Sequence, residues 1–186
     1  MSPLEVIAAL LGVCSVWLTV RQNPWCWPVG LVMVALYAWF FYGAGLYSQV
    51  LLHGVYAVVQ LYGWWRWTRG NAEGPLQVSI AGRSEVAAGV AIAIVGSLAL
   101  GAAMSTLPEA VYPRLDATLV AFSLLAQFWM ARKRLQCWPL WLVLDIAYVA
   151  LFWHQGYQLT AALYVVFVLL AILGWRQWRN AQPATV

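Results

Sequence analysis

The sequence predicts an all-α membrane protein with seven transmembrane helices in a 3+1+3 arrangement, and two observations lead to this fold class. Hydrophobic residues make up 64% of the 186 residues and charged residues only 9%, whereas soluble domains contain about 25% charged residues. The chain also repeats itself at an offset of 111 residues. The repeated motifs are Cys26-Trp27-Pro28 with Cys137-Trp138-Pro139, and Gly63-Trp64 with Gly174-Trp175. Internal repeats of hydrophobic segments are typical of membrane transporters, whose substrate sites lie between the repeats.

Seven apolar stretches are long enough to cross a bilayer, which takes about 17–25 mostly apolar residues. They lie near 4–20, 27–43, 48–66, 85–105, 116–131, 138–153 and 159–176. Their apolar runs are continuous rather than alternating, which favours helices over the strands of a membrane β-barrel. The N-terminus lacks the basic segment of a cleaved signal peptide, so we expect the first stretch to remain as a helix.

The order of the stretches predicts two three-helix repeats, 1–69 and 113–180, joined by a linker at 70–112 and followed by a short tail at 181–186. The linker contains the fourth stretch, which is rich in small aliphatic residues and has no aromatic residue. One additional span restores the orientation of the second repeat, so that both repeats run in the same direction. The one substantial hydrophilic stretch, 68–85, is too short for a folded domain.

The distribution of positive charges predicts the orientation of the chain. Nine of the ten Lys and Arg residues fall on one side of the seven-helix arrangement, and only Arg114 falls on the other. Because loops rich in Lys and Arg stay in the cytoplasm, we expect the N-terminus outside and the C-terminus inside. The cations are scattered between apolar runs, so the pI of about 9.2 does not indicate a nucleic-acid partner. The sequence predicts no cofactor, metal site or catalytic centre, since the usual phosphate-loop and zinc motifs are missing.

Polar side chains within the spans are the candidate functional residues, because they are costly in lipid and tend to face a cavity. Asp145 lies in the sixth stretch, where a carboxylate costs roughly 2.5–3.5 kcal/mol, and its counterpart in the first repeat is Val34. Trp141, Asp145 and Tyr148 share one helix face by their spacing, and Tyr37 is the counterpart of Tyr148. We predict that Asp145 lines the substrate cavity. A structural hydrogen bond or proton coupling are the alternatives.

The third stretch has a polar and aromatic face of its own. The residues that step along it by three or four are His53, Tyr56, Gln60, Trp64 and Trp67. Gln60 has the apolar counterpart Ala171 and is therefore predicted to bind substrate. His53 lies nearer the outer end, where a functional role and a role at the interface are equally expected. Gln127 on the fifth stretch, opposite Val16 in the repeat, is a third candidate ligand.

The thirteen tryptophans have two expected roles. Trp67 and Trp178 are flanked by arginines, which is typical of anchors at the membrane interface. Trp64 and its counterpart lie a turn deeper, where a ring could stack on a flat ligand. Trp141 is the best stacking candidate because it shares a face with Asp145. An aromatic surface beside one carboxylate suits a planar cation.

Several motifs together resemble the PnuC family of vitamin transporters over nearly the whole chain. They are Cys26-Trp27-Pro28, Tyr62-Gly63-Trp64-Trp65-Arg66-Trp67, Arg132-Lys133, Trp138-Pro139-Leu140-Trp141 and Gly174-Trp175-Arg176-Gln177-Trp178. The resemblance implies a multi-pass protein of the bacterial inner membrane, related to the SWEET sugar transporters and assembled as a homotrimer. It also implies facilitated diffusion of an unphosphorylated B-vitamin, which a cytoplasmic kinase then phosphorylates and so traps inside.

Within that family, nicotinamide riboside is the favoured substrate and thiamine the alternative. Both are flat aromatic molecules with one positive charge, so either suits an anionic Asp145, and the aminopyrimidine of thiamine could also donate a hydrogen bond to it. Riboflavin is neutral and bulkier, and it gains least from the carboxylate. A proton-coupled symporter that uses Asp145 as its proton carrier is a less favoured mechanism.

Overall fold

The computed structural model describes residues 3–43, 47–70, 74–105 and 112–182. These residues form seven helices, as predicted: α1 (Pro3–Val20), α2 (Cys26–Gly43), α3 (Tyr47–Arg69), α4 (Arg83–Met104), α5 (Pro113–Ala131), α6 (Cys137–His154) and α7 (Gln158–Asn180). Among the described helices, α2, α4, α6 and α7 are long and apolar enough to cross a membrane by length and composition. Most of the predicted tail at 181–186 lies outside the described residues.

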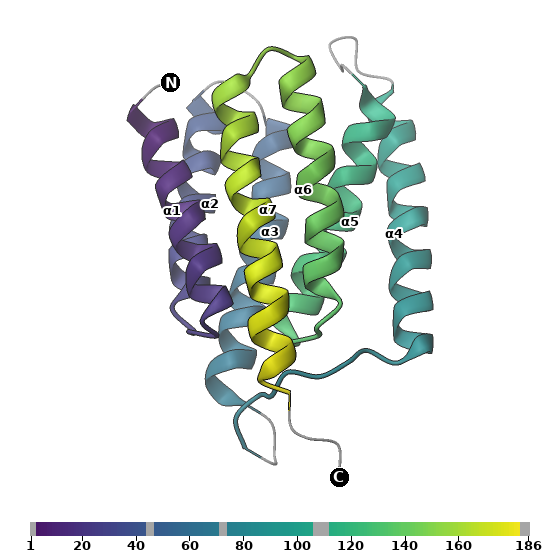
Figure 1. Cartoon of the computed structure of the whole chain (residues 1–186). Helices are drawn as coiled ribbons and strands as arrows, with labels where there is room; N and C mark the ends of the chain where they lie inside the picture. Colours follow the sequence, from purple (N-terminus) through teal and green to yellow (C-terminus); the bar gives the residue numbers. More distant parts are fainter. Residues whose placement is uncertain (1–2, 44–46, 71–73, 106–111, 183–186) are drawn as a thin grey trace.

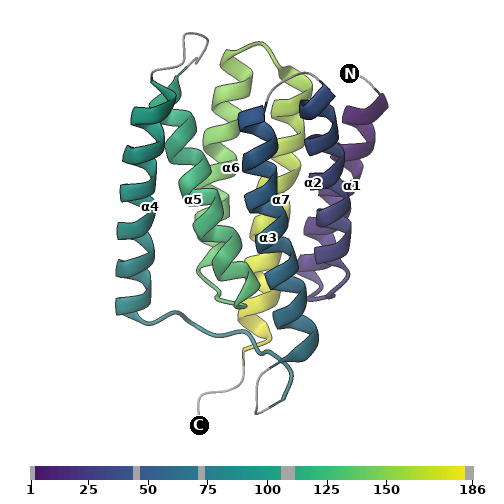
Figure 2. The same cartoon turned by 180° about the vertical axis from the view of Figure 1, so that it is seen from behind.

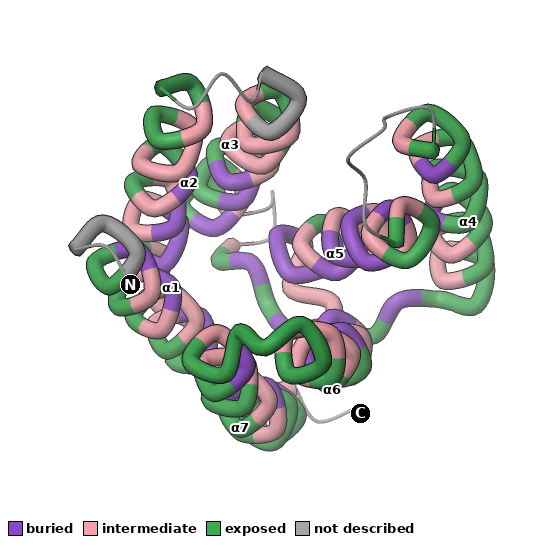
Figure 3. The backbone as a smooth tube through the Cα atoms, turned by 90° about the horizontal axis from the view of Figure 1, so that it is seen from above, coloured by how far each residue is buried: buried purple, intermediate pink, exposed green. Residues whose placement is uncertain are grey.

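Six helices pack into a closed ring, and the fourth lies outside it. Neighbouring helices pack in the order α1, α2, α3, α5, α6 and α7, and α7 returns to α1. The view along the bundle shows this ring with α4 set apart (Figure 3). Within the described chain, α4 packs against α5 alone. The ring therefore surrounds a central space to which α4 contributes nothing.

The helices run alternately up and down, so the loops gather at two ends of the bundle (Figures 1 and 2). We call the end where α1, α3, α5 and α7 finish the lower end, as it is drawn in Figure 1. Helices α2, α4 and α6 begin there. Arg114 lies in the first turn of α5 at the upper end, whereas the other nine cations lie in or beside helix ends at the lower end.

The prediction that Trp67 and Trp178 anchor the protein at the membrane interface is wrong. Both are buried, Trp67 at 7% and Trp178 at 0% exposure, because α3 and α7 extend about one turn beyond their predicted ends. The indole nitrogen of Trp67 donates to the carbonyl oxygens of Met130 and Ala131, at 3.3 and 3.2 Å. That of Trp178 donates to the carbonyl of Thr19 at 3.1 Å. The N–H donor of each indole is thus hydrogen-bonded inside the bundle and does not require water at the membrane interface.

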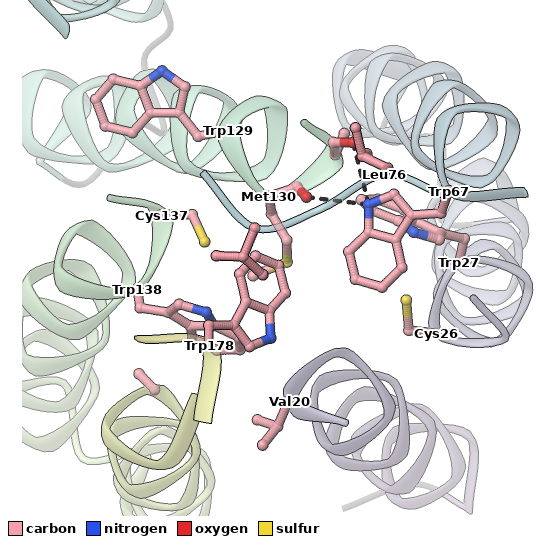
Figure 4. Close-up of a cluster of buried hydrophobic side chains, with 13 residues drawn as sticks. Val20, Cys26, Trp27, Trp67, Leu76, Trp129, Met130, Cys137, Trp138 and Trp178 are labelled. Carbon is pink, nitrogen blue, oxygen red and sulfur yellow. Dashed lines mark hydrogen bonds between the residues drawn. The ribbon is translucent and has the colours of Figure 1, made fainter. Parts of the chain in front are cut away.

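Four tryptophans close the lower end of the ring, and we call them the tryptophan plug: Trp27, Trp67, Trp138 and Trp178. Their ring centres follow one another at 5.5 Å from Trp27 to Trp67, 5.8 Å to Trp178 and 5.3 Å to Trp138. The first and last of these pairs meet edge to face, an arrangement that aromatic rings favour. Figure 4 shows the four rings together with the side chains of Cys26 and Cys137, whose thiols are buried.

Two glycines make room for the plug. A Cβ atom at Gly63 would collide with the ring of Trp27, and one at Gly174 would collide with the ring of Trp138. Any larger residue would therefore push a tryptophan out of the core. The duplicated Gly-Trp and Cys-Trp-Pro motifs are thus explained by packing, since each supplies one half of a glycine–tryptophan contact.

The hydrophilic stretch that joins α3 to α4 is more than a loop. Its residues 74–82, which we call the strap, cross the lower end of the bundle (Figure 2). Three apolar side chains of the strap are buried, Leu76 at 7%, Val78 at 3% and Ala81 at 5% exposure. Leu76 and Val78 belong to the same core as the plug. The strap therefore covers the plug from below.

Backbone and side-chain hydrogen bonds hold the strap against the turn between α5 and α6. The amide of Ser79 donates to the carbonyl of Lys133 at 3.0 Å, and the amide of Leu135 donates to the carbonyl of Ser79 at 2.9 Å. The side-chain amide of Gln136 bonds both backbone groups of Ala81, at 2.9 and 3.0 Å. These four bonds fix the path of a segment that has no helix of its own.

The turns after α1 and α5 meet beneath the plug. Gln22 and Lys133, which hold equivalent positions in the predicted repeats, both have a left-handed backbone, with φ of 55° and 51°. The ammonium of Lys133 donates to Oε1 of Gln22 at 3.1 Å and lies 4.6 Å from the ring centre of Trp67. Burial lowers the pKa of Lys133. A cation, an amide and an indole thus join the two halves of the ring at this end.

Candidate substrate cavity

A cavity of about 550 Å³ lies inside the ring. This volume is in the range of small-molecule sites, roughly 300–1,000 Å³. All six helices of the ring contribute to its lining. Met130 and Trp138 line it at the lower end, so the plug forms its floor.

Seven of the eight residues that the sequence predicts as substrate ligands line this one cavity. They are Tyr37, His53, Gln60, Gln127, Trp141, Asp145 and Tyr148. They come from α2, α3, α5 and α6. Three of them, Gln60, Gln127 and Asp145, are polar residues that stand opposite an apolar residue in the other repeat, and the fold brings these three together.

Trp64 is the exception, since its side chain is 42% exposed and does not line the cavity. The inner face of α3 instead carries Gln60, Gly63 and Trp67, at the spacing i, i+3, i+7. Trp64 follows Gly63 directly and therefore points about 100° away around the helix. Its counterpart Trp175 is 39% exposed. Neither ring therefore lies where it could stack on a ligand in this cavity.

Asp145 is the most distinctive group of the cavity. It is 4% exposed, and among the described residues its carboxylate has neither a hydrogen bond nor a salt bridge. The phenols of Tyr148 and Tyr164 line the same cavity. An ionised carboxyl group buried without a partner is costly, so it pairs with a cation or a hydrogen-bond donor, or it takes up a proton. Asp145 is therefore a candidate partner for a cationic or hydrogen-bonding ligand.

Gln60 and Trp141 each have a small residue, Ala171 and Gly30, at the equivalent position of the other half. A Cβ atom at Gly30 would lie 2.5 Å from Nε2 of Gln60, so glycine leaves the room that the amide occupies. At the equivalent positions of the second half, the large residue is Trp141 and the small one is Ala171. Among the described residues the buried indole nitrogen of Trp141 has no hydrogen-bond partner. It is therefore a donor available to a ligand.

The sequence reasoning missed two polar residues on α5, Asp116 and Ser123. They line the cavity together with Val120 and Gln127, at the spacing i, i+4, i+7, i+11 from Asp116. This helical stripe was visible in the sequence. The predicted stretch begins at 116, whereas the helix starts at Pro113 and places Asp116 in its first turn. A carboxylate there is favoured by the helix dipole.

Two aromatic groups line the cavity towards the upper end: Tyr37, Phe41 and His53 in one half, and Tyr148, Phe152 and Tyr164 in the other. The ring of His53 lies 5.8 Å from Tyr37 and 5.1 Å from Phe41. In the second group the rings of Tyr148 and Tyr164 are 4.8 Å apart. The cavity is therefore aromatic towards the upper end, where Asp116 also lies, carries Gln60, Gln127 and Asp145 further down, and has Trp138 at its lower end.

Comparison with known proteins identifies the family. The family model described as nicotinamide mononucleotide transporter matches residues 2–180. The chain belongs to this family. It is a family of transporters and not of enzymes, and the chain is accordingly a multi-pass protein of the bacterial inner membrane.

Sequence similarity to transporters that are named for different vitamins covers nearly the whole chain. The riboflavin/roseoflavin transporter RibM of Streptomyces davaonensis is 30% identical over 96% of this chain and 88% of its own. The nicotinamide riboside transporter PnuC of Escherichia coli is 24% identical over 97% of this chain and 87% of its own. The crystal structure of the vitamin B3 transporter PnuC has a TM-score of 0.77 and 25% identity, over 96% of this chain and 81% of that one. The resemblance to the PnuC family is thereby confirmed.

Proposed function

We propose that the chain carries an unphosphorylated aromatic vitamin through the central cavity, and that nicotinamide riboside is its preferred substrate. The observation that carries this choice is Asp145, a buried carboxylate that has no partner among the described residues and lies beside Trp141. A pyridinium cation offers this carboxylate the opposite charge that it lacks. The relatives named as a nicotinamide riboside transporter and as a vitamin B3 transporter support the same class of substrate.

In the proposed complex, each polar group of the vitamin meets a group of the cavity. The pyridinium ring stacks on the indole of Trp141, and Asp145 compensates its charge. The side-chain amides of Gln60 and Gln127 bond to the carboxamide and the ribose. Gln60 is 8% exposed, and neither amide has a hydrogen bond with the described part of the protein, so both are free to pair with a ligand.

Riboflavin is the second candidate, and the 30% identity to RibM supports it. An isoalloxazine ring also stacks on aromatic side chains, but it is neutral and leaves the charge of Asp145 without compensation. Thiamine remains the alternative with a positive charge, because its aminopyrimidine can donate a hydrogen bond to a carboxylate. The three vitamins therefore differ in how they would interact with Asp145: the riboside by charge, thiamine by charge and a hydrogen bond, and riboflavin without an opposite charge.

For transport, we infer that two three-helix repeats, 1–69 and 113–180, rock about the cavity while the linker at 70–112 connects them. The indole hydrogen bonds between α3 and α5 and between α7 and α1 support this division, since they join the two halves at the closed end. The gathering of nine cations at the lower end supports a cytoplasmic C-terminus. We further propose facilitated diffusion by a homotrimer, with phosphorylation by a cytoplasmic kinase giving uptake its direction.

Calorimetric titration of the purified protein in detergent tests the substrate. Nicotinamide riboside, thiamine, riboflavin and nicotinamide mononucleotide are titrated in turn. We expect the riboside to bind at least tenfold more tightly than the other three. Riboflavin binding without a response to the riboside would overturn the proposed substrate.

The mechanism is tested in vesicles that contain the protein. Facilitated diffusion predicts that exchange of labelled riboside across the membrane is unchanged by an imposed pH gradient. Accumulation that follows the pH gradient would instead show proton coupling.

A further inference from the structure

A second pocket, of about 390 Å³, opens at the lower end of the bundle. Three arginines contribute to its lining, Arg66 from the end of α3 and Arg132 and Arg134 from the turn after α5. The strap forms another wall, including Gly74 and Ser79. This pocket shares no lining residue with the substrate cavity, so it is a separate feature of the molecule.

Two of the three arginines already have partners. Arg132 lies 3.3 Å and Arg134 lies 2.8 Å from the carboxylate oxygens of Glu85. Arg134 also donates to the hydroxyl of Ser79 at 2.8 Å. One carboxylate thus serves two guanidinium groups, and the strap hydroxyl helps to hold the second.

Arg66 has no such partner. Its Nε atom is buried without a hydrogen bond in the described structure, and no described carboxylate forms a salt bridge with it. Its position is fixed, because the next residue, Trp67, is buried in the plug. Among the described residues the pocket therefore holds three positive charges against the single negative charge of Glu85, and one guanidinium is left with its donors available.

We propose that this pocket binds a phosphate group, with Arg66 as its principal ligand. A guanidinium offers two parallel N–H donors to phosphate oxygens, and the surplus of positive charge favours an anion. The pocket lies at the cation-rich end of a membrane protein, where phosphate occurs both in lipid headgroups and in soluble phosphate esters. The shared chemistry is a phosphate held by Arg66, with Arg132 and Arg134 adding charge.

A phosphate bound there would tie together the three segments that close the lower end. Arg66 is joined to Trp67 of the plug, the strap residue Leu76 packs on the plug, and Arg132 follows Met130 on the cavity floor. A ligand that binds only the closed arrangement stabilises it by its binding free energy. We expect phosphate at this end to slow the opening of the cavity. This consequence depends on the proposed transport function, whereas the binding itself does not.

Thermal unfolding in detergent tests the soluble form of the ligand. Melting is compared in sodium phosphate and in sodium chloride of equal ionic strength, for the unaltered protein, Arg66→Gln and Arg69→Gln. Arg69 is the matched control, since it is an exposed arginine on the same helix that does not line the pocket. We expect phosphate to raise the melting temperatures of the unaltered protein and of Arg69→Gln by similar amounts. In Arg66→Gln the rise should be at most half as large. An equal loss in both variants would show a general charge effect and would overturn the site.

Lipid binding is tested by native mass spectrometry of the same proteins from nanodiscs of phosphatidylglycerol or phosphatidylcholine. A lipid ligand predicts that phosphatidylglycerol is retained by the unaltered protein and reduced at least threefold in Arg66→Gln. If the Arg66→Gln protein does not fold, Gln77→Glu replaces it, because this exposed strap residue lines the pocket and its carboxylate would repel phosphate. Retention of both the phosphate and the lipid effect in these variants would refute the proposal. Phosphate binding without any vitamin transport would instead refute the proposed function alone.

Discussion

At the scale of single residues, the cavity is shaped by an exchange of large and small side chains between its two halves. Gly30 and Gln60 occupy the positions that Trp141 and Ala171 occupy in the other half. One half therefore presents an amide where the other presents an indole. This difference could be read from the sequence because the constant offset pairs the positions. Pairing alone did not show that glycine is needed for Gln60 to fit, since this depends on the close approach of two helices.

The contact between Gly30 and Gln60 leads to a first prediction. Gly30→Ala should displace the amide of Gln60 and weaken vitamin binding about tenfold, the loss of roughly one hydrogen bond. Gly54→Ala is the control, because a Cβ atom at Gly54 meets no atom within 4 Å. Calorimetry on both variants checks the expectation. Equal affinity of Gly30→Ala and Gly54→Ala would show that Gln60 does not contact the ligand.

At the scale of structural elements, the lower end depends on contacts that the sequence concealed. An arginine-flanked tryptophan has the same local pattern whether it anchors at an interface or ends a buried helix turn. The difference at Trp67 and Trp178 lies in carbonyl acceptors far away in the chain. The burial of the strap could not be predicted from the sequence either. Its apolar residues Leu76 and Val78 alternate with polar ones over too short a stretch to give a recognisable pattern. The seven helices themselves were predicted because each one is long and continuous.

The indole of Trp178 provides a second prediction. Trp178→Phe keeps an aromatic ring but removes the indole donor to the carbonyl of Thr19, which among the described residues then accepts only from the amide of Gln22. The loss of this hydrogen bond costs about 0.5–1.5 kcal/mol. We expect the lower end to open more often, so that the buried thiols of Cys26 and Cys137 react faster with a maleimide in a Cys14→Ser background. Trp175→Phe serves as control, since Trp175 is exposed. Unchanged labelling in Trp178→Phe would mean that this bond does not hold the plug closed.

The strap provides a third prediction. Leu76→Ala should destabilise the protein by about 2–5 kcal/mol, the usual cost of a large-to-small change in a core, because Leu76 is buried against the plug. The neighbouring Gln77 is exposed, so Gln77→Ala should change stability by less than about 0.5 kcal/mol. Thermal melting in detergent compares the two. A similar small effect of both changes would show that the strap does not belong to the core.

At the scale of the whole molecule, six helices enclose the site and one stays outside. The aromatic-free composition of α4 predicts a connector, and within the described chain this helix packs beside α5 alone. The order of the helices in the ring could not be predicted, because it is fixed by contacts between distant segments such as α1 with α7 and α3 with α5. The cavity exists only when that ring is closed.

The orientation of the whole molecule leads to a fourth prediction. Tyr157 lies just before α7 at the upper end, and Arg69 ends α3 at the lower end. With a cytoplasmic C-terminus, an impermeant maleimide should label Tyr157→Cys in intact cells and Arg69→Cys only after the membrane is opened. Cys14→Ser provides the background for both. The reverse pattern would show that the positive charges do not face the cytoplasm.

The central claim, that Asp145 binds a cationic vitamin, is tested most directly by two ligands of nearly equal shape. Nicotinamide riboside carries a positive ring, whereas its reduced form is neutral, and calorimetry gives the affinity of each for the unaltered protein and for Asp145→Asn. We expect the unaltered protein to prefer the cation at least tenfold, about 1.4 kcal/mol, and Asp145→Asn to lose most of that preference. An equal preference in both proteins would contradict the account.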